Sequence, residues 1–341
     1  MKPFGVDDKP WVIVAMDDFL PIAQSLVAAR LGTICTGCSF KKFPDGTPDI
    51  SLAAHDVEGR DVLFIGSPEP GRYLEFFSIV YSIPRYFARS LLVILPYFPT
   101  GTMERVEREG EVATAKTLIR MMSAAPPGQT QTTYLMFDIH ALATRFFFSD
   151  CVKVLLPSVI HDVPFREVFT SNFIVCFPDL GAAKRFSFPF SQCGYKRTVT
   201  CSKIRGPGNS RQVVLQDGNE AVRGAHVLVV DDLVQSGSTL AACRDALYAA
   251  GAGSVAAFVV HAVFPRQSWK HFLTDENGME PSKRKGFTHF FVTDTQPWTI
   301  TNLEGKRPYR VLPIAPSLIR ILTTGHAAKA NTTSLGVDAK L

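Results

Sequence analysis

The 341-residue sequence has no long uninterrupted hydrophobic run. Its longest apolar stretch, residues 76–99, is broken by Pro84, Arg85 and Arg89, so it does not span a membrane. The apolar run at residues 11–16 is shorter than the core of a secretory signal. We therefore expect neither a secretory leader nor a membrane partner.

Cysteines are few: the chain has seven, an odd number, and they are scattered. That pattern argues against a disulfide framework and predicts a reducing compartment, or an organelle that imports folded cytosolic protein. Cys35-Thr36-Gly37-Cys38 has the spacing of a zinc knuckle or a redox motif. No second such pair and no histidine pair follows it, so the sequence favours a packing role for these two thiols.

An excess of charge of either sign is also missing. The chain has 36 basic and 31 acidic residues, a net charge of +5, and the excess is spread along its length. This is too mild to indicate a nucleic-acid partner, although it is compatible with a small anionic substrate. Hydrophobic residues make up 46%, which permits large buried cores, and the length predicts about two domains.

Short apolar runs alternate with helical patterns along the whole chain, which predicts an α/β fold with mainly parallel sheets flanked by helices. We expect two similar domains, residues 1–160 and 161–325, and a flexible tail at 326–341. In such sheets ligands bind at the carboxyl ends of strands, so the residues after each apolar run are the site candidates. Helices are predicted at 21–32, where Gly32 would close the helix, and at 112–122; strands are predicted at 11–16, 61–66, 91–97, 134–138, 173–177, 226–230, 254–261 and 287–292.

The clearest candidate site follows the predicted strand 226–230. Asp231 and Asp232 come first, then the loop Gln235-Ser236-Gly237-Ser238-Thr239, and then a helix that Gly251 ends. Backbone N–H groups and hydroxyls of such a loop can hold an anion, and a glycine lets the backbone approach it closely. The paired acids can accept hydrogen bonds from sugar hydroxyls, directly or through a metal. A capped turn with two solvated acids is the alternative, but this run of hydroxyl residues is too elaborate for it.

Three further segments carry groups suited to phosphate chemistry. The first could be a core histidine, and the third could be a solvated turn. In the second, Lys184 could be a phosphate-binding lysine, but no Walker pattern surrounds it, so Lys184 and Arg185 are interpreted as supporting charge. The segments are Asp138-Ile139-His140, Pro178-Asp179-Leu180-Gly181 with Lys184-Arg185, and Lys203-Ile204-Arg205-Gly206-Pro207-Gly208.

The loop at 231–239 resembles the phosphoribosyl-diphosphate loop of type I phosphoribosyltransferases and of ribose-phosphate diphosphokinases. The three further segments favour the diphosphokinases, and the resemblance extends over roughly residues 10–325. It implies two tandem type I phosphoribosyltransferase-like domains and at least a homodimer. It also implies Mg²⁺-dependent transfer of the diphosphate of ATP to the C1 hydroxyl of ribose 5-phosphate, giving 5-phosphoribosyl-1-diphosphate and AMP.

The same resemblance assigns roles to individual residues. Residues 42–47 are similar to a loop that, in these oligomers, reaches into a neighbour's adenine pocket. The Lys-x-Arg loop would stabilise the charge on the transferring group and on the leaving AMP. The implied residues are Lys203 and Arg205 for catalysis; Asp231, Asp232, Gln235, Ser236, Gly237, Ser238 and Thr239 for ribose 5-phosphate; Phe43, Asp45, Glu104, Arg105 and His140 for ATP; and His140 and Asp179 for the metal.

Some positions depart from the common pattern. Thr47 replaces an acid, Thr102 and Met103 replace an Arg-Gln pair that contacts ATP, and Gln235 stands where most members carry Asp. Glu104 and Arg105 are the candidates to contact ATP in place of that Arg-Gln pair. Together with residues 110–115 and 264–270, these departures are similar to the plant-type second class of the family, which implies activity without phosphate activation or ADP inhibition and a looser choice of donor.

Two other functions stay open at this point. The altered ATP positions are compatible with an inactive regulatory subunit of such an enzyme, although the retained acids, His140 and Lys203 argue against it. A base-specific phosphoribosyltransferase would share the loop at 231–239 but not the Asp-Ile-His segment.

The chain ends in Ala339-Lys340-Leu341, a variant of the Ser-Lys-Leu tripeptide that addresses proteins to peroxisome-type organelles. This predicts a peroxisome-type import receptor as partner and a peroxisome or glycosome as location.

Overall fold

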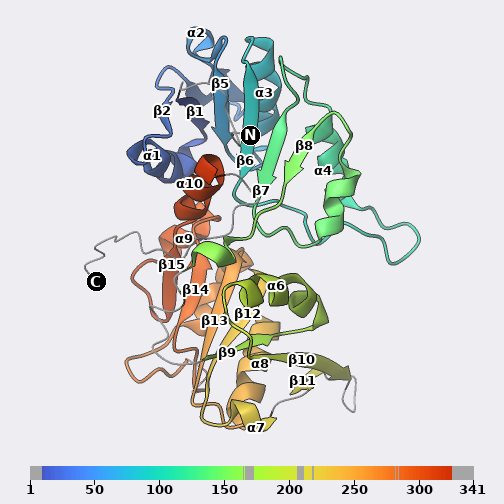
Figure 1. The fold of residues 1–341 in the computed structure, drawn as a ribbon, viewed down its shortest axis with the longest axis vertical. Coiled ribbons are helices and arrows are strands. Elements are labelled where there is room, and N and C mark those ends of the chain that lie inside the picture. Colours follow the sequence, from blue (N-terminus) through green and yellow to red (C-terminus); the bar gives the residue numbers. More distant parts are fainter. Residues whose placement is uncertain are drawn as a thin grey trace.

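The computed structural model describes residues 10–163, 165, 173–205, 211–216, 219–280, 282 and 284–324. The chain forms two α/β bodies stacked along the long axis of the molecule, each built on a mainly parallel sheet (Figure 1). This confirms the predicted fold class. No helix in the described ranges is long and apolar enough to cross a membrane. The predicted tail and its terminal tripeptide lie outside the described residues.

The first sheet is parallel throughout, with strand order β2-β1-β5-β6-β7-β8. A separate antiparallel hairpin, β3-β4, leaves it after β2. The elements are β1 Trp11–Ala15, η1 Asp17–Phe19, α1 Leu20–Ala28, β2 Gly32–Ile34, β3 Ser39–Lys42, β4 Pro48–Ser51, α2 Ala54–Val57, β5 Asp61–Ile65, α3 Tyr73–Arg85, β6 Ser90–Leu95, α4 Thr114–Ser123, β7 Thr133–Met136, η2 Leu142–Phe147, β8 Lys153–Leu155 and η3 Val159–Asp162.

The second sheet has the order β11-β10-β9-β12-β13-β14-β15 and is parallel except for the pair β10-β11. Its η5 segment is kinked where Arg266 and Gln267 take left-handed backbone angles. The elements are β9 Phe173–Phe177, α6 Leu180–Gln192, β10 Thr198–Arg205, β11 Arg211–Leu215, α7 Asn219–Val222, β12 His226–Val234, α8 Ser238–Ala249, β13 Ser254–Ala262, η5 Pro265–Phe272, β14 Phe290–Thr293, α9 Pro297–Leu303, β15 Tyr309–Leu312 and α10 Ala315–Thr324.

The central strands of the second sheet are buried on both faces. In β12, Val227 and Val229 pack into one apolar cluster, while Leu228 and Val230 pack into the cluster that also holds the first sheet. Successive side chains of a strand point to opposite faces, so a continuous apolar run fits a doubly covered parallel strand. Full burial of each such side chain contributes about 1.5–3 kcal/mol.

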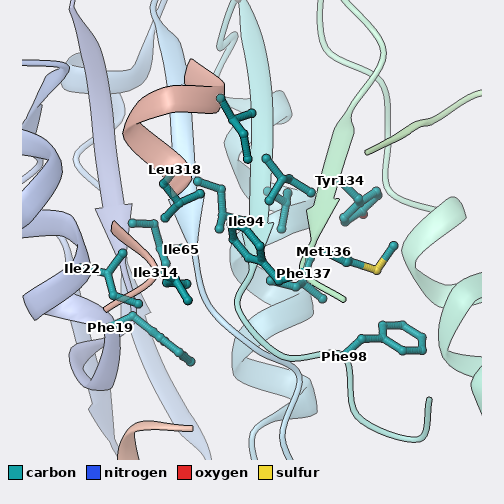
Figure 2. Close-up of a cluster of buried hydrophobic side chains, with 14 of the residues drawn as sticks. Phe19, Ile22, Ile65, Ile94, Phe98, Tyr134, Met136, Phe137, Ile314 and Leu318 are labelled. Carbon is teal, nitrogen blue, oxygen red and sulfur yellow. The ribbon is translucent and has the colours of Figure 1, made fainter. Parts of the chain in front are cut away.

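The last helix returns to the first body. In Figure 1, α10 lies beside α1, and Figure 2 shows Ile314 and Leu318 against side chains of η1, α1 and β5. A polar contact holds the same place: the carboxylate of Asp162 accepts hydrogen bonds from Arg320 Nε at 2.8 Å and Ser317 Oγ at 2.6 Å. The core of the first body therefore contains residues from the end of the second. The boundaries 1–160 and 161–325 stay a prediction.

Several predicted element ends differ from the structure, three of them by three residues or more. The helix α1 ends at Ala28, not at Gly32, because Arg30 takes a φ of 60° and Leu31 N–H donates back to Leu26, as in a Schellman cap. Gly32 instead begins β2. The strand predicted at 287–292 runs over Phe290–Thr293, and β12 continues past the two acids to Val234.

Candidate functional site: an acid pair and an anion loop between the two bodies

Gln235, Ser236 and Gly237 join β12 to the twelve-residue helix α8, whose first two residues are Ser238 and Thr239. Gly237 is the N-cap residue of α8 and has a φ of 75°, in the left-handed region that glycine adopts without strain. A Cβ atom at this position would lie 2.4 Å from two ring carbons of the buried Phe272. Both observations explain why this position is glycine.

The loop borders a cavity of about 320 Å³ that also includes Asp231. Ser236, Ser238 and Thr239 line it with hydroxyl groups, beside the amino end of α8, where backbone N–H groups and the helix dipole favour an anion. Ser268 Oγ donates to the carbonyl of Gln235 at 2.7 Å and so fixes the start of the loop. Thr102 of the first body forms part of the wall, a contact that no local sequence pattern indicates.

Asp231 and Asp232 lie in neighbouring positions of β12 but differ in environment. Burial raises the pKa of Asp231 well above its ordinary value, and the charges of Asp232 and Asp179 add to this effect. Asp232 is also buried, which alone would raise its pKa, but a hydrogen bond with His140 brings the pKa below its ordinary value. The acid pair therefore holds one stable negative charge and one carboxyl group that is poised to stay neutral.

His140 belongs to the first body and Asp232 to the second, yet His140 Nδ1 lies 2.6 Å from Asp232 Oδ2. This hydrogen bond raises the pKa of His140, so the imidazolium form is favoured. The backbone before it is unusual, since Asp138 has a φ of 38°. The buried Asp138 carboxylate accepts from Val159 N–H at 2.8 Å and lies 3.5 Å from Arg185, which secures this turn against both bodies.

Glu104 and Arg105 lie close enough to His140 to change its pKa, Glu104 upward and Arg105 downward. Arg105 is exposed, with its Nε 3.3 Å from the buried Glu104 Oε1. Three buried polar atoms in this region have no partner within the described residues: Glu104 Oε2, Thr100 Oγ1 and Arg185 Nη1. Buried polar groups normally bond to something, so their presence together is typical of a site that receives a polar ligand.

Asp179 is the N-cap residue of α6, and its Oδ1 accepts the N–H of Ala182 at 3.0 Å. Its charge acts on Asp231, so the two carboxylates are near neighbours. Among the described residues, no group of three or more His, Cys, Asp or Glu side chains is placed to hold a metal ion alone. Mg²⁺ commonly binds through one or two carboxylates, waters and substrate phosphates, so these acids fit such a shared site.

Two predicted groups lie apart from these contacts. Asp45 accepts hydrogen bonds from the N–H and the hydroxyl of Thr47, and half of Phe43 is exposed at the tip of the β3-β4 hairpin. Lys203 and Arg205 belong to the backbone of β10, where they pair with Val213 and Arg211 of β11, and their side chains lie outside the described part. Gly206 to Gly208 are also outside it.

His261 of β13 is buried and joins the two bodies. Its Nε2 donates to the carbonyl of Phe137 at 3.1 Å, and burial lowers its pKa, so the ring is neutral. A larger hollow, of about 780 Å³, includes residues that directly precede β14 and β15. It is therefore at the amino ends of these strands, the edge of a parallel sheet where ligands are not expected.

Comparison with known proteins agrees with this architecture. Residues 12–125 match the family model of the N-terminal domain of ribose phosphate pyrophosphokinase, and residues 175–279 match that of the phosphoribosyl transferase domain. Ribose-phosphate pyrophosphokinase 4 of Arabidopsis thaliana is 40% identical over 303 residues, which are 87% of each chain. The chain belongs to the ribose-phosphate pyrophosphokinase family.

Other relatives support the same assignment. The chloroplastic ribose-phosphate pyrophosphokinase 3 of Oryza sativa subsp. japonica is 38% identical over 88% of this chain and 72% of its own length. Both relatives are plant proteins, which confirms the predicted likeness to the plant-type class. The crystal structure of phosphoribosylpyrophosphate synthetase from Mycobacterium smegmatis superimposes with a TM-score of 0.74 at 21% identity, over 92% of this chain and 98% of that one, and confirms the fold.

Proposed function

We propose that this pyrophosphokinase family member transfers the diphosphate of Mg-ATP to the C1 hydroxyl of ribose 5-phosphate, giving 5-phosphoribosyl-1-diphosphate and AMP. The observation that carries the proposal is the contact of His140 with Asp232. It brings a histidine of the first body, which favours its charged form, against the carboxylates of β12 and near the loop that begins at Gln235 in the second body. A phosphorylated sugar and a nucleotide can therefore meet between the two bodies.

On the sugar side, the phosphate of ribose 5-phosphate binds Ser236, Gly237, Ser238 and Thr239 at the amino end of α8. Its ring hydroxyls donate to the carboxylates of β12. Gln235 lines the same cavity. Because Asp231 favours its neutral form, approach of a cation or of the sugar hydroxyls would let it ionise.

On the nucleotide side, the imidazolium of His140 and the exposed guanidinium of Arg105 face the phosphates, and Glu104 holds Arg105 in place. Phe43 and Asp45 contact the adenine of a neighbouring subunit, which requires at least a homodimer. Sedimentation of the purified chain tests this: an active monomer would contradict it.

Bound Mg²⁺ would neutralise phosphate charge and orient the diphosphate. The residues that would hold it are Asp179 and His140, with Asp231 close by. The hydrogen bond of His140 Nδ1 to Asp232 leaves the other ring nitrogen, which donates its N–H to a phosphate oxygen in the imidazolium form and would have to lose that proton to bind the metal. Isothermal titration of Mg-ATP into an Asp179→Asn variant should give weaker binding; unchanged affinity would contradict the assignment.

Lys203 and Arg205 supply positive charge to the leaving AMP as the C1 hydroxyl attacks the β-phosphorus. Loss of one such electrostatic group typically lowers turnover by about 10²–10³-fold. We expect Lys203→Ala to lower turnover by about 10²-fold or more while ribose 5-phosphate still binds. Equal turnover in that variant would refute the assigned role.

Phosphorus NMR of the purified chain with Mg-ATP and ribose 5-phosphate tests the activity itself. We expect AMP and phosphoribosyl diphosphate to appear only when both substrates are present. We also expect the reaction to proceed when no free phosphate is added. Intact ATP with bound ribose 5-phosphate would instead identify a regulatory subunit. Product formation only with an added purine or pyrimidine base would identify a base-specific phosphoribosyltransferase.

We also propose import into a peroxisome-type organelle through Ala339-Lys340-Leu341. A fluorescent protein that carries residues 326–341 should accumulate in peroxisomes or glycosomes. The same fusion without the last three residues is the control, and identical distributions would contradict the proposal.

A further inference from the structure

Cys35 and Cys38 flank a turn that connects the first sheet to the β3-β4 hairpin. Cys35 directly follows β2, and its N–H donates to the carbonyl of Ile13 at 2.8 Å, so it extends the sheet by one residue. Thr36 and Gly37 form the turn, and Cys38 directly precedes β3. The first and last positions of a four-residue turn lie within about 7 Å, a separation that a disulfide can bridge.

The two thiols are already in contact. Cys38 Sγ lies 3.4 Å from Cys35 Sγ, and the bond length of a disulfide is about 2.05 Å, so the sulfurs need to approach by about 1.4 Å. Gly37 holds the turn close to the following segment, since a Cβ atom there would be 2.8 Å from the Cβ of Ala53. The thiols therefore meet in a turn that is held by Ile13 on one side and packed against Ala53 on the other.

The pair is asymmetric in a way that suits thiol exchange. Cys35 is only 8% exposed, and it donates to Asp56 Oδ2 at 3.5 Å, whereas Cys38 is half-buried and reaches the surface. Burial raises the pKa of Cys35 to about 12, so this thiol is protonated at neutral pH and must pass its proton to a base before it can attack. Asp56 is placed to receive that proton.

We propose that Cys35 and Cys38 are a reversible dithiol–disulfide site, with Cys38 the thiol that reacts first, Cys35 the resolving thiol and Asp56 its proton acceptor. The sequence favoured a packing role for this pair. The contact between the two sulfurs, the contact of Cys35 with Asp56 and the accessibility of Cys38 favour a chemical role instead. A metal role has no such support, because the described residues contain no set of three His, Cys, Asp or Glu side chains suited to an ion.

With hydrogen peroxide as oxidant, the thiolate of Cys38 attacks one peroxide oxygen and the O–O bond breaks. Cys38 becomes a sulfenic acid, and the departing hydroxide takes up the proton that Cys38 released, forming water. Cys35 then gives its proton to Asp56 and attacks Cys38 sulfur. The S–S bond forms, the S–O bond breaks, and the second hydroxide leaves as water with the proton from Asp56. Two thiols are oxidised by two electrons, and one peroxide is reduced to two waters.

The second sheet provides an internal comparison. Cys176 Sγ and Cys201 Sγ lie 3.6 Å apart, almost as close, but both side chains are fully buried. Hydrogen bonds with Cys176 and Cys243 lower the pKa of Cys201 to about 4, which gives this sulfur thiolate character. Because peroxide has no access to the buried pair, we still expect it to stay reduced while the pair in the turn reacts. Cys151 is exposed and controls for exposure without a neighbouring thiol.

Oxidation would act on the hairpin. A disulfide across residues 35–38 would fix the point where β3 leaves the sheet, while Phe43 and Asp45 lie at the far end of the same hairpin. The bond would thus restrict the orientation of the tip. If the tip contacts ATP, the KM for ATP changes on oxidation; this second effect depends on the proposed function, whereas the thiol chemistry does not.

The test is peroxide titration of the full-length reduced protein, followed by alkylation, trypsin digestion and mass spectrometry. Residues 31–41 form one tryptic peptide that contains both thiols, whereas Cys176 and Cys201 fall in different peptides. We expect the 31–41 peptide to lose two hydrogen atoms and become resistant to alkylation, with dithiothreitol reversing the change. At the same peroxide concentration the Cys176 and Cys201 peptides should be alkylated as thiols.

Variants separate the two roles. Cys35→Ser should leave a sulfenic acid at Cys38 that dimedone traps. Cys38→Ser should slow oxidation of Cys35 by at least about tenfold, because the buried Cys35 must then react with peroxide directly. A 31–41 peptide that stays doubly alkylated while Cys151 oxidises would overturn the proposal. So would a Cys38 that passes to sulfinic acid in the wild-type protein without forming the bond. Because these readouts are masses, they give the same answer whether or not the protein makes phosphoribosyl diphosphate.

Discussion

The anion loop depends on a glycine for two separable reasons, and Gly237→Ala tests both. The first is backbone strain: an alanine in the left-handed region costs about 1–2 kcal/mol. The second is space, because the new Cβ would lie 2.4 Å from two ring carbons of Phe272. Ordinary contact begins near 3.4 Å, so the ring must move by about 1 Å.

Phe272 has no room for that movement. It is 2% exposed, and its ring centroid lies 5.3 Å from Phe290 and 5.8 Å from Phe287. Overpacking of a filled core costs about 1–3 kcal/mol, which adds to the strain. We therefore expect Gly237→Ala to lower the free energy of unfolding by about 2–5 kcal/mol.

Gly278→Ala is the matched control. Gly278 has a φ of 74°, almost the same as that of Gly237, but a Cβ there would meet nothing within 4 Å. This variant should lose only the strain, about 1–2 kcal/mol. Urea unfolding with an unchanged m-value measures both losses. Equal losses, within about 0.5 kcal/mol, would refute the steric part of the reasoning.

Three further predictions concern charged groups. Burial raises the pKa of Asp294 to about 6, so the stability that its neutral form contributes is complete below the unfolded pKa near 3.9 and is lost as pH rises through 6. Asp294→Asn keeps an acceptor for Ile314 N–H, so this variant should be more stable than wild type by about 1–3 kcal/mol at pH 8 and equally stable at pH 4. The same dependence of stability on pH in both proteins would contradict this. Asp162→Asn breaks the contact with Arg320 and should cost about 2 kcal/mol in urea unfolding, since hydrogen bonds to charged groups contribute about 1.5–3 kcal/mol; no loss would mean that the packing of α10 suffices. Asp232→Asn removes the carboxylate that raises the pKa of His140, so the NMR titration of that imidazole should move toward its ordinary value near 6.5, and an unmoved titration would point to another partner.

The sequence predicted what depends on local pattern. The doubly buried strands are continuous apolar runs, and Asp231 and Asp232 stand where such a run ends, so both the sheets and the position of the acid pair could be expected. The loop at 235–239 could be expected as well, because serine, glycine and threonine directly before a helix are typical of an anion site. These are features in which neighbouring residues carry the whole signal.

What depends on distant partners could not be predicted in this way. The contact between His140 and Asp232 joins positions 92 residues apart, and no periodicity marks it. Thr102 reaches the wall of the cavity beside Ser236 and Thr239 only because the two bodies meet there. The end of α1 was misplaced because Arg30, a residue without a turn preference, takes the left-handed position that glycine usually occupies.

The position of α10 also sets an order of events during synthesis. The face of the first body next to α1 and β5 is completed by residues that follow the whole second sheet in the chain. A ribosome that has made the whole first sheet has therefore not yet made the helix that covers it. The apolar surface next to α1 and β5 therefore stays exposed during synthesis until α10 leaves the ribosome. In a chain that ends before α10, this surface would stay accessible to chaperones and proteases. Synthesis of α10 is therefore the step that covers this face of the first body.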